Sequence, residues 1–242
     1  FRRSLLYPLK YELFSYQHEV CDFIRRRERI RDNISSGALV VMRMGLGKTL
    51  CALSCISLSL KHQRRLNQQT LYVSVANTLC DVRHQCQKFF PVHMIPYILN
   101  YNINRTSIQY KNGTVRPNKN LHNTDIVIIS YATLRSLWLC RHKQSVYRDF
   151  IFKRTWYRIV FDESHMLMNG DTQLYQSVIQ LMATRKFAMT GTVMRNTIYD
   201  VLYQLHALNV VNSVHKDSKS LSHIERITDF WDFDVLDVKT SI

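Results

Sequence analysis

The chain has 242 residues, and its 33 lysines and arginines outnumber its 18 aspartates and glutamates, for a formal net charge of +15. Hydrophobic residues make up 46% and charged residues 21% of the chain, which is typical of a folded domain and excludes disorder as its main state. No run approaches 18 consecutive apolar residues, so we expect no membrane-spanning helix. The six cysteines show neither a zinc-type pair spacing nor a disulfide framework, and a reducing compartment fits them best.

The positive charge is spread unevenly along the chain. Residues 1–216 hold 30 basic and 12 acidic residues, whereas residues 217–242 hold 3 basic and 6 acidic ones. The basic body predicts a polyanionic partner such as DNA, RNA or a nucleotide. Its densest basic run, residues 25–31, is explained equally well as a solvated helix face. We interpret the acidic end as a separate segment.

Short apolar runs alternate with helical stretches along the chain. Strands are predicted over residues 38–42, 71–75, 95–99, 125–129, 158–161 and 186–190. Helices are predicted over residues 48–62, 76–90, 131–142 and 198–208, and by the spacing of Leu174, Val178, Leu181 and Met182; residues 100–124 are predicted to be a loop. This alternation predicts an α/β fold of three layers with a mainly parallel central sheet. Ligands of such sheets bind at the carboxyl ends of the strands.

A phosphate-binding pattern lies between the first predicted strand and the helix that follows it. Gly47, Lys48 and Thr49 match the end of the pattern G-x-x-x-x-G-K-[ST], although Met42 replaces its first glycine. Glycines let backbone N–H groups approach phosphate oxygens, a lysine neutralises the β- and γ-phosphates, and a threonine hydroxyl binds Mg²⁺. The strand–turn–helix context favours this function over a chance match.

Two acids end the predicted strand at residues 158–161. Asp162 is a candidate Mg²⁺ ligand, and Glu163 is a candidate general base that polarises the attacking water. The alternative is a pair of surface acids at a helix start, where acidic residues are favoured. His165 follows closely, either as an ordinary residue near a helix end or as a coupling residue between nucleotide and nucleic acid. No metal-ligand partner is spaced around it, which argues against zinc.

Six motifs occur in an order that is similar to one known family. They are Leu13 to Val20, Met44 to Thr49, Leu71 to Pro91, Asp125 to Leu134, Trp156 to His165, and Thr190 to Asn196 followed by Tyr203 to Leu205. Together they resemble the Swi/Snf-related ATPases of helicase superfamily 2. The basic residues after Tyr16 are similar to those of a subgroup of repair translocases and viral global transactivators.

The resemblance implies the first RecA-like lobe of an ATP hydrolase that uses ATP and Mg²⁺. It assigns catalysis to Lys48, Asp162 and Glu163. It assigns Mg²⁺ binding to Thr49 and Asp162. It assigns nucleotide binding to Gln17, Met44, Gly45, Leu46, Gly47, Lys48 and Thr49, with Gln17 reading the adenine. It assigns coupling between ATP state and DNA contact to His165, Thr190, Gly191 and Thr192.

The same resemblance implies partners and a domain plan. The family translocates on double-stranded DNA, usually without separating the strands, and its further partners include chromatin and transcription proteins. We therefore expect a nuclear location, in a host nucleus or a viral factory. Residues 1–208 would form the ATP-binding lobe, and residues 209–242 an acidic segment or a linker to a second RecA-like lobe in a longer chain. Because the family's arginine fingers lie in that second lobe, we expect this lobe alone to be an incomplete enzyme.

Departures from the family pattern keep one alternative open. Met42 and Arg43 stand where the family has Asp-Glu, Val75 and Val193 replace prolines, and Arg195 replaces a glutamine. The alternative is a degenerate lobe that acts as a non-catalytic DNA- or protein-binding regulator. A phosphate-loop kinase is disfavoured, since the other five motifs would then be coincidence.

Overall fold

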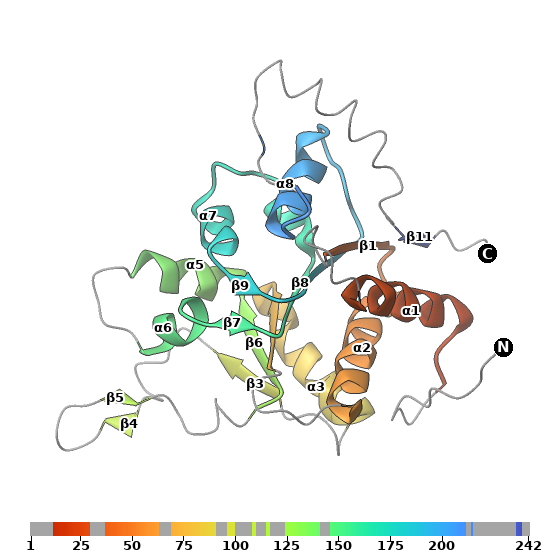
Figure 1. Ribbon diagram of the computed structural model, residues 1–242, viewed down its shortest axis with the longest axis horizontal. Helices are drawn as coiled ribbons and strands as arrows, with labels where there is room; N and C mark the ends of the chain where they lie inside the picture. Colours follow the sequence, from red (N-terminus) through yellow and green to blue (C-terminus); the bar gives the residue numbers. More distant parts are fainter. Residues whose placement is uncertain are drawn as a thin grey trace.

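The computed structural model describes residues 12–29, 37–62, 69–90, 96–99, 108–109, 115–116, 124–140, 146–211, 214 and 236–238. In this part of the chain, seven strands form one sheet in the order β11-β1-β10-β8-β2-β6-β3, and every neighbouring pair is parallel (Figure 1). The strands are β1 (Ala38–Met42), β2 (Thr70–Ser74), β3 (Pro96–Leu99), β6 (Ile126–Ser130), β8 (Arg158–Asp162), β10 (Lys186–Thr190) and β11 (Leu236–Val238). The predicted parallel sheet is confirmed.

Helices cover both faces of the sheet. One face packs against α1 (Ser15–Arg29), α2 (Lys48–His62) and α3 (Leu79–Phe89), the last preceded by the short η1 (Ala76–Thr78). The other face packs against α5 (Tyr131–Leu139), α6 (Val146–Phe152), α7 (Gln173–Ile179) and α8 (Tyr199–Ala207).

Successive side chains of each strand point to opposite faces of the sheet, and this alternation produces the two cores. In β8, Ile159 and Phe161 belong to the core under α5 to α8, whereas Val160 belongs to the core under α1 to α3. Successive side chains of a strand point to opposite faces, so a strand that is apolar throughout must be covered on both sides. All five residues of β8 are buried. The predicted three-layer α/β fold is confirmed.

Most element bounds agree with the sequence prediction to within a few residues, and β1, β10 and α2 agree at both ends. The helix predicted through Leu181 and Met182 is wrong at its end, because α7 stops at Ile179. Met182 instead begins β9 (Met182–Ala183), which pairs with β7 (Thr155–Trp156). The loop predicted over residues 100–124 contains β4 (Ile108–Gln109) paired antiparallel with β5 (Val115–Arg116); the rest of it lies outside the described residues.

The acidic end of the chain contributes a strand that the sequence did not indicate. β11 pairs in parallel with β1 at the edge of the sheet. The rest of residues 215–242 lies outside the described ranges, so the boundary at residue 208 stays a prediction. In the described part of the chain, no helix is long and apolar enough to span a membrane.

Two buried cationic side chains at the amino ends of the strands have polar partners, but only Arg158 has a counter-charge. Arg158 is 1% exposed, and its Nη2 donates to Glu28 Oε2 at 2.7 Å and to Ser59 Oγ at 2.6 Å, while its Nε donates to Glu28 Oε1. Burial acts to lower the pKa of Arg158, but the Glu28 carboxylate outweighs it and the net shift is upward. Lys186 is also buried, and its Nζ donates to the Ala207 carbonyl and to Asn209 Oδ1.

Candidate nucleotide site at the carboxyl edge of the sheet

The phosphate loop leads from β1 into α2 through two glycines in the left-handed region. Gly45 and Gly47 both have φ of +83°, a conformation that side chains other than glycine rarely adopt. Gly47 is also crowded, because a Cβ there would lie 2.5 Å from Gln17 Nε2. The glycines predicted from sequence are therefore required by the backbone, and α2 begins directly after them at Lys48.

Lys48 lies at the centre of the predicted residues. Its Nζ is 3.3 Å from Glu163 Oε1 and donates to the Met42 carbonyl at 3.4 Å. A Cβ on Gly191 would lie 3.7 Å from the same Nζ, so β1, β8 and β10 all deliver residues to one point. The lysine side chain is 8% exposed and Glu163 18%. The structure thus brings the phosphate loop, the acidic strand end and the Thr190–Thr192 segment together.

Asp162 is held by hydroxyl groups from the neighbouring strand. Tyr72 and Ser74 of β2 donate to Asp162 Oδ2 at 3.0 and 3.2 Å, and the Glu163 amide donates to Oδ1 at 3.0 Å. Burial raises the pKa of Asp162, while the hydroxyl bonds act in the opposite direction. Burial raises the pKa of Tyr72, and the nearby Thr49 side chain acts in the opposite direction. Tyr72 therefore lies close to both predicted Mg²⁺ ligands.

Glu163 has a backbone conformation that its side chain does not favour. Its φ and ψ are both 50°, in the left-handed region, where an L-residue with a Cβ loses roughly 1–2 kcal/mol. The chain turns here from β8 into the short η3 (Ser164–Leu167). Glu163 Oε2 is buried, accepts no hydrogen bond and lies 3.2 Å from His165 Nδ1. Strain and an unsatisfied buried oxygen at one residue are typical of functional positions.

Gln17 lies across the phosphate loop. Its Nε2 donates to the Leu46 carbonyl at 3.1 Å, and its Oε1 accepts from the Phe14 amide at 3.1 Å. Tyr16 reinforces this contact, because its hydroxyl donates to the same Leu46 carbonyl at 3.3 Å. The predicted adenine-reading residue is thus in direct contact with the predicted phosphate-binding loop. The side chain of Met44 in that loop is exposed.

Comparison with known proteins identifies the family. The sequence profile of the SNF2-related domain matches residues 16–219. The chain is a member of the SNF2-related domain family. The profile covers five of the six predicted motifs entirely and most of the first, from Tyr16 onward.

Individual relatives of this SNF2-related domain agree with the predicted subgroup. It is 31% identical to the DNA repair protein RAD5A of Arabidopsis thaliana over 106 residues, 43% of this chain and 10% of the relative. It is 26% identical to the "Probable global transactivator" of Orgyia pseudotsugata multicapsid polyhedrosis virus over 197 residues, 81% of this chain and 35% of the relative. The chain therefore spans about a third or less of these relatives' lengths.

A solved structure has the same fold. The Sulfolobus solfataricus SWI2/SNF2 ATPase core, in complex with double-stranded DNA, superposes with a TM-score of 0.65 at 22% identity, covering 84% of this chain and 37% of that one. This similarity confirms the RecA-like lobe predicted from the sequence.

Two residues of the SNF2-related site were missed by sequence reasoning as functional positions. Tyr72 was assigned only to a strand, and Gln204 only to a motif. Gln204 is fully buried; its Oε1 accepts from Ser164 at 2.6 Å and its Nε2 donates to the Val193 carbonyl at 2.8 Å. It thus joins the segment after the acidic strand end to the segment after Thr192. Gln204 also donates to the Asp200 carbonyl four residues before it, but the partners that join separate segments are 11 to 90 residues away, and no local pattern reveals them.

The predicted coupling residues Thr190 and Thr192 bond to each other. Thr190 Oγ1 accepts from the Thr192 amide at 3.1 Å and donates to the Thr192 carbonyl at 2.9 Å. Gly191 between them approaches Lys48, whereas the Thr192 side chain is exposed. This compact turn sets the path of the chain toward α8.

The described residues fit a Mg²⁺ ion that is shared with a nucleotide. Mg²⁺ prefers oxygen ligands and is commonly held by one or two protein side chains together with phosphates and water. Asp162 and the Thr49 hydroxyl supply such oxygens on either side of Tyr72, and Glu163 Oε2 beside them has a free acceptor. The described residues hold no cluster of three or more His, Cys, Asp or Glu.

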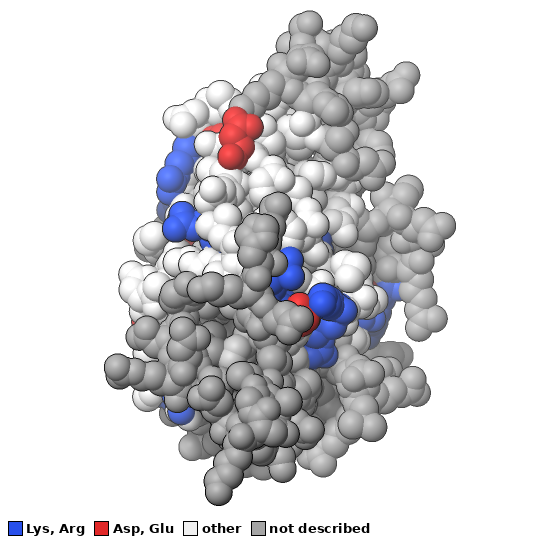
Figure 2. All heavy atoms as spheres, turned by 90° about the vertical axis from the view of Figure 1, so that its left-hand side faces the viewer, with Lys and Arg blue, Asp and Glu red and all other residues white. Residues whose placement is uncertain are grey.

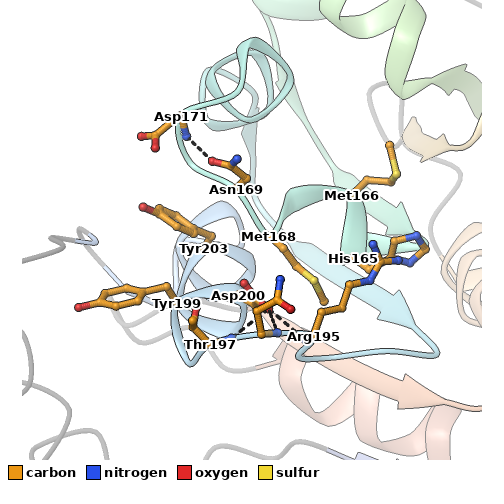
Figure 3. Close-up of a pocket in the computed structure, with 11 residues that line it drawn as sticks. His165, Met166, Met168, Asn169, Asp171, Arg195, Thr197, Tyr199, Asp200 and Tyr203 are labelled. Atoms are coloured by element: carbon orange, nitrogen blue, oxygen red, sulfur yellow. Dashed lines mark hydrogen bonds between the residues drawn. The ribbon is translucent and has the colours of Figure 1, made fainter.

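A hollow of about 620 Å³ lies next to this site rather than in it (Figure 3). It is lined by His165, Met166, Met168, Asn169, Asp171, Arg195, Asn196, Thr197, Tyr199, Asp200 and Tyr203. None of the phosphate-loop residues is among them. His165 belongs to both places, since it lines the hollow and contacts Glu163.

Proposed function

We propose that this chain is the ATP-binding lobe of a DNA-dependent ATPase that translocates on double-stranded DNA. The observation that carries the proposal is the convergence of Lys48, Thr49, Asp162 and Glu163 at one edge of the sheet. Family membership supports nucleotide hydrolysis, and the fold relative bound to double-stranded DNA supports the partner. The proposed location is the nucleus, or a viral factory if the source is viral, with chromatin or transcription proteins as further partners.

Each of these residues has a defined role in hydrolysis. Lys48 exchanges Glu163 for the β- and γ-phosphates, which carry more negative charge than one carboxylate. Glu163, freed from Lys48, positions a water for in-line attack on the γ-phosphorus and takes up its proton. Thr49 and Asp162 would hold Mg²⁺, which when bound would neutralise charge on the phosphate oxygens. Gln17 then reads the adenine from the rim of the loop.

The positive charge supports binding to DNA without locating a groove. On the face drawn in Figure 2, lysines and arginines lie in several separate groups, with acidic side chains among them. Phosphate contacts release counterions, so affinity for duplex DNA should fall steeply as salt rises. Affinity that does not change with salt would contradict this part of the proposal.

The decisive experiment titrates Mg·ATP into the chain and into two lysine variants. Lys48→Ala should abolish binding, because the γ-phosphate loses its cation. Lys153→Ala is the matched control: Lys153 is exposed, pairs with Asp149 on α6 and should leave affinity unchanged. Equal affinity of wild type and Lys48→Ala would overturn the nucleotide site and favour the degenerate, regulatory lobe.

Turnover should remain close to background for the chain alone. Arginine fingers add about 10³–10⁵-fold to phosphoryl-transfer rates, and in this family they come from the second lobe. Supplying that lobe, in cis or in trans, should restore DNA-stimulated hydrolysis, and Glu163→Gln should then abolish it. Brisk DNA-stimulated hydrolysis by residues 1–242 alone would show that no second lobe is needed.

A further inference from the structure

The hollow beside the nucleotide site has two chemically different ends. Arg195 and His165 lie on one side of it, Tyr199 and Tyr203 project on the other, and Met168 and Asp200 lie between them (Figure 3). A volume of about 620 Å³ is within the usual range for sites that bind a small organic group. An occupant that matches both ends needs an anionic group and a flat, partly apolar group.

Several polar groups around the hollow are not used by the fold. In the described part of the chain, the Arg195 guanidinium, the side-chain amide of Asn196 and the Tyr199 hydroxyl have no hydrogen-bond partner, and Arg195 and Asn196 are exposed. The backbone amides at the start of α8 are not free in the same way. Those of Arg195, Asn196 and Thr197 all donate to Asp200 Oδ2, at 2.9, 2.8 and 3.4 Å. An anion in the hollow would therefore be bound by the arginine side chain rather than by the helix end.

The aromatic end offers one ring for stacking and one for support. Tyr203 is 8% exposed and packs against the backbone of Gly170, where a Cβ would lie 2.2 Å from the ring. It also makes an edge contact with Tyr175, so it is fixed as part of the wall. Tyr199 is only half-buried. It packs in part against the core under α5 to α8, and it lines the hollow together with Asn196.

We propose that this hollow receives one unpaired nucleotide of DNA, with its phosphate at Arg195 and its base at Tyr199. Bases stack on aromatic side chains whatever their sequence, arginine binds phosphate with two donors, and an amide can bond to a base edge. A base inside a duplex cannot enter, so the site selects gaps, forks or ends. This inference rests on the proposed DNA-dependent ATPase and names the DNA structure that it prefers.

The hollow is connected to the proposed hydrolytic residues through His165. His165 lines the hollow and lies 3.2 Å from Glu163 Oε2, and Glu163 Oε1 lies 3.3 Å from Lys48 Nζ. An occupant of the hollow therefore contacts a residue that touches the carboxylate paired with Lys48.

The test measures binding of residues 1–242 to two labelled DNAs of equal length, one an intact duplex and one with a central five-nucleotide single-stranded gap. The gapped DNA carries fewer phosphates, so tighter binding to it cannot come from charge. We expect the gapped DNA to bind about 5- to 160-fold more tightly, the range for stacking of one base. If the five single-stranded nucleotides facing the gap are made abasic, the phosphates remain but the bases are gone, and this preference should be lost.

Variants assign the preference to the hollow. Arg195→Gln and Tyr199→Leu should each remove most of it, Tyr199→Phe should keep it, and Arg26→Gln, an exposed arginine on α1, is the control for lost charge. If Tyr199→Leu fails to fold, as judged by lost Mg·ATP affinity, Arg195→Gln and Asn196→Ala carry the test on exposed residues. Equal affinity of wild type for both DNAs, or a preference that survives Arg195→Gln and Asn196→Ala, would overturn the inference.

Two other outcomes can be told apart from these. If the hollow is instead a contact site for a second lobe, the two DNAs should bind equally, and Arg195→Gln should weaken association of the lobes. That outcome also overturns the inference. If Lys48→Ala leaves Mg·ATP affinity unchanged, the proposed ATPase fails while the gap preference can still be measured on its own.

Discussion

The two ends of the central sheet treat buried charge in opposite ways. At the amino end, the Glu28 carboxylate neutralises the charge of Arg158, which also donates a hydrogen bond to a serine hydroxyl. At the carboxyl end, Lys48 shares one oxygen of Glu163, whose other oxygen accepts no hydrogen bond. Buried polar groups are normally satisfied, so an unsatisfied one marks a place kept for something else. The comparison separates charges that stabilise the fold from charges that serve a ligand.

Matching substitutions at the two ends should give the largest difference. Glu28→Gln leaves Arg158 buried without its counter-charge, and breaking such a pair costs about 3–5 kcal/mol. Glu163→Gln should cost less than Glu28→Gln, because the Glu163 side chain is more exposed than that of Glu28 and one of its oxygens accepts no hydrogen bond, although it contacts Lys48 and His165. Urea unfolding of both variants measures the two values. Equal losses would remove the distinction between the ends.

The amino end also predicts a dependence of stability on pH. Burial lowers the pKa of Lys186 to about 8, whereas a lysine in the unfolded chain has a pKa near 10.4. Below pH 8 the cost of the buried charge is present in full. Between pH 8 and about 10.4 the unfolded state holds a proton that the folded state has released, so the free energy of unfolding rises, by at most about 3 kcal/mol.

Cysteines and tyrosines titrate in the same pH range, so the contribution of Lys186 must be isolated by difference. The buried Cys86, for example, has a pKa raised to about 12, which makes stability fall above the pKa of an unfolded cysteine. Urea unfolding of wild type and Lys186→Met at several values of pH from 7 to 10.5 gives the required difference. Curves that run parallel for the two proteins would refute the assignment to Lys186.

The smallest expected effect isolates the backbone of Glu163. Glycine adopts a φ of +50° without penalty, so Glu163→Gly should be about 1 kcal/mol more stable than Glu163→Ala. Arg83→Gly and Arg83→Ala provide the control in the middle of α3, where glycine should be less stable than alanine by a similar amount. Thermal or urea unfolding of the four variants measures the stability difference between glycine and alanine at each position. A Glu163→Ala variant that is as stable as Glu163→Gly would show that no strain is stored there.

What the sequence could predict depended on how local the signal was. The strand–turn–helix at Lys48 and the acids after β8 are short patterns, and their order along the chain indicated the family. The bonds of Tyr72 to Asp162 and of Glu28 to Arg158 join residues 90 and 130 positions apart. They depend on strand order, which no local pattern contains. Glu28 stood in a basic run that reads equally well as a solvated helix face, although it neutralises a buried arginine.

The wrong end of the helix after Gln173 has the same physical cause. Leu181 and Met182 continue a helical spacing, but the backbone leaves the helix at Gln180 and Met182 pairs with Thr155 of β7. Tertiary pairing overrode a periodicity that extended three residues beyond the end of the helix.

The position of β1 has a consequence for synthesis of the protein. β1 is among the first strands to be made, yet its neighbours in the sheet are β10 and β11, from the far end of the chain. At about 5–20 residues per second, roughly 150 further residues occupy the ribosome for about 10–30 s before β10 exists. Throughout that interval the strand that leads into the phosphate loop has no partner, and ATP cannot assist its folding. The nascent amino-terminal segment is therefore the part of this lobe that most needs protection by chaperones.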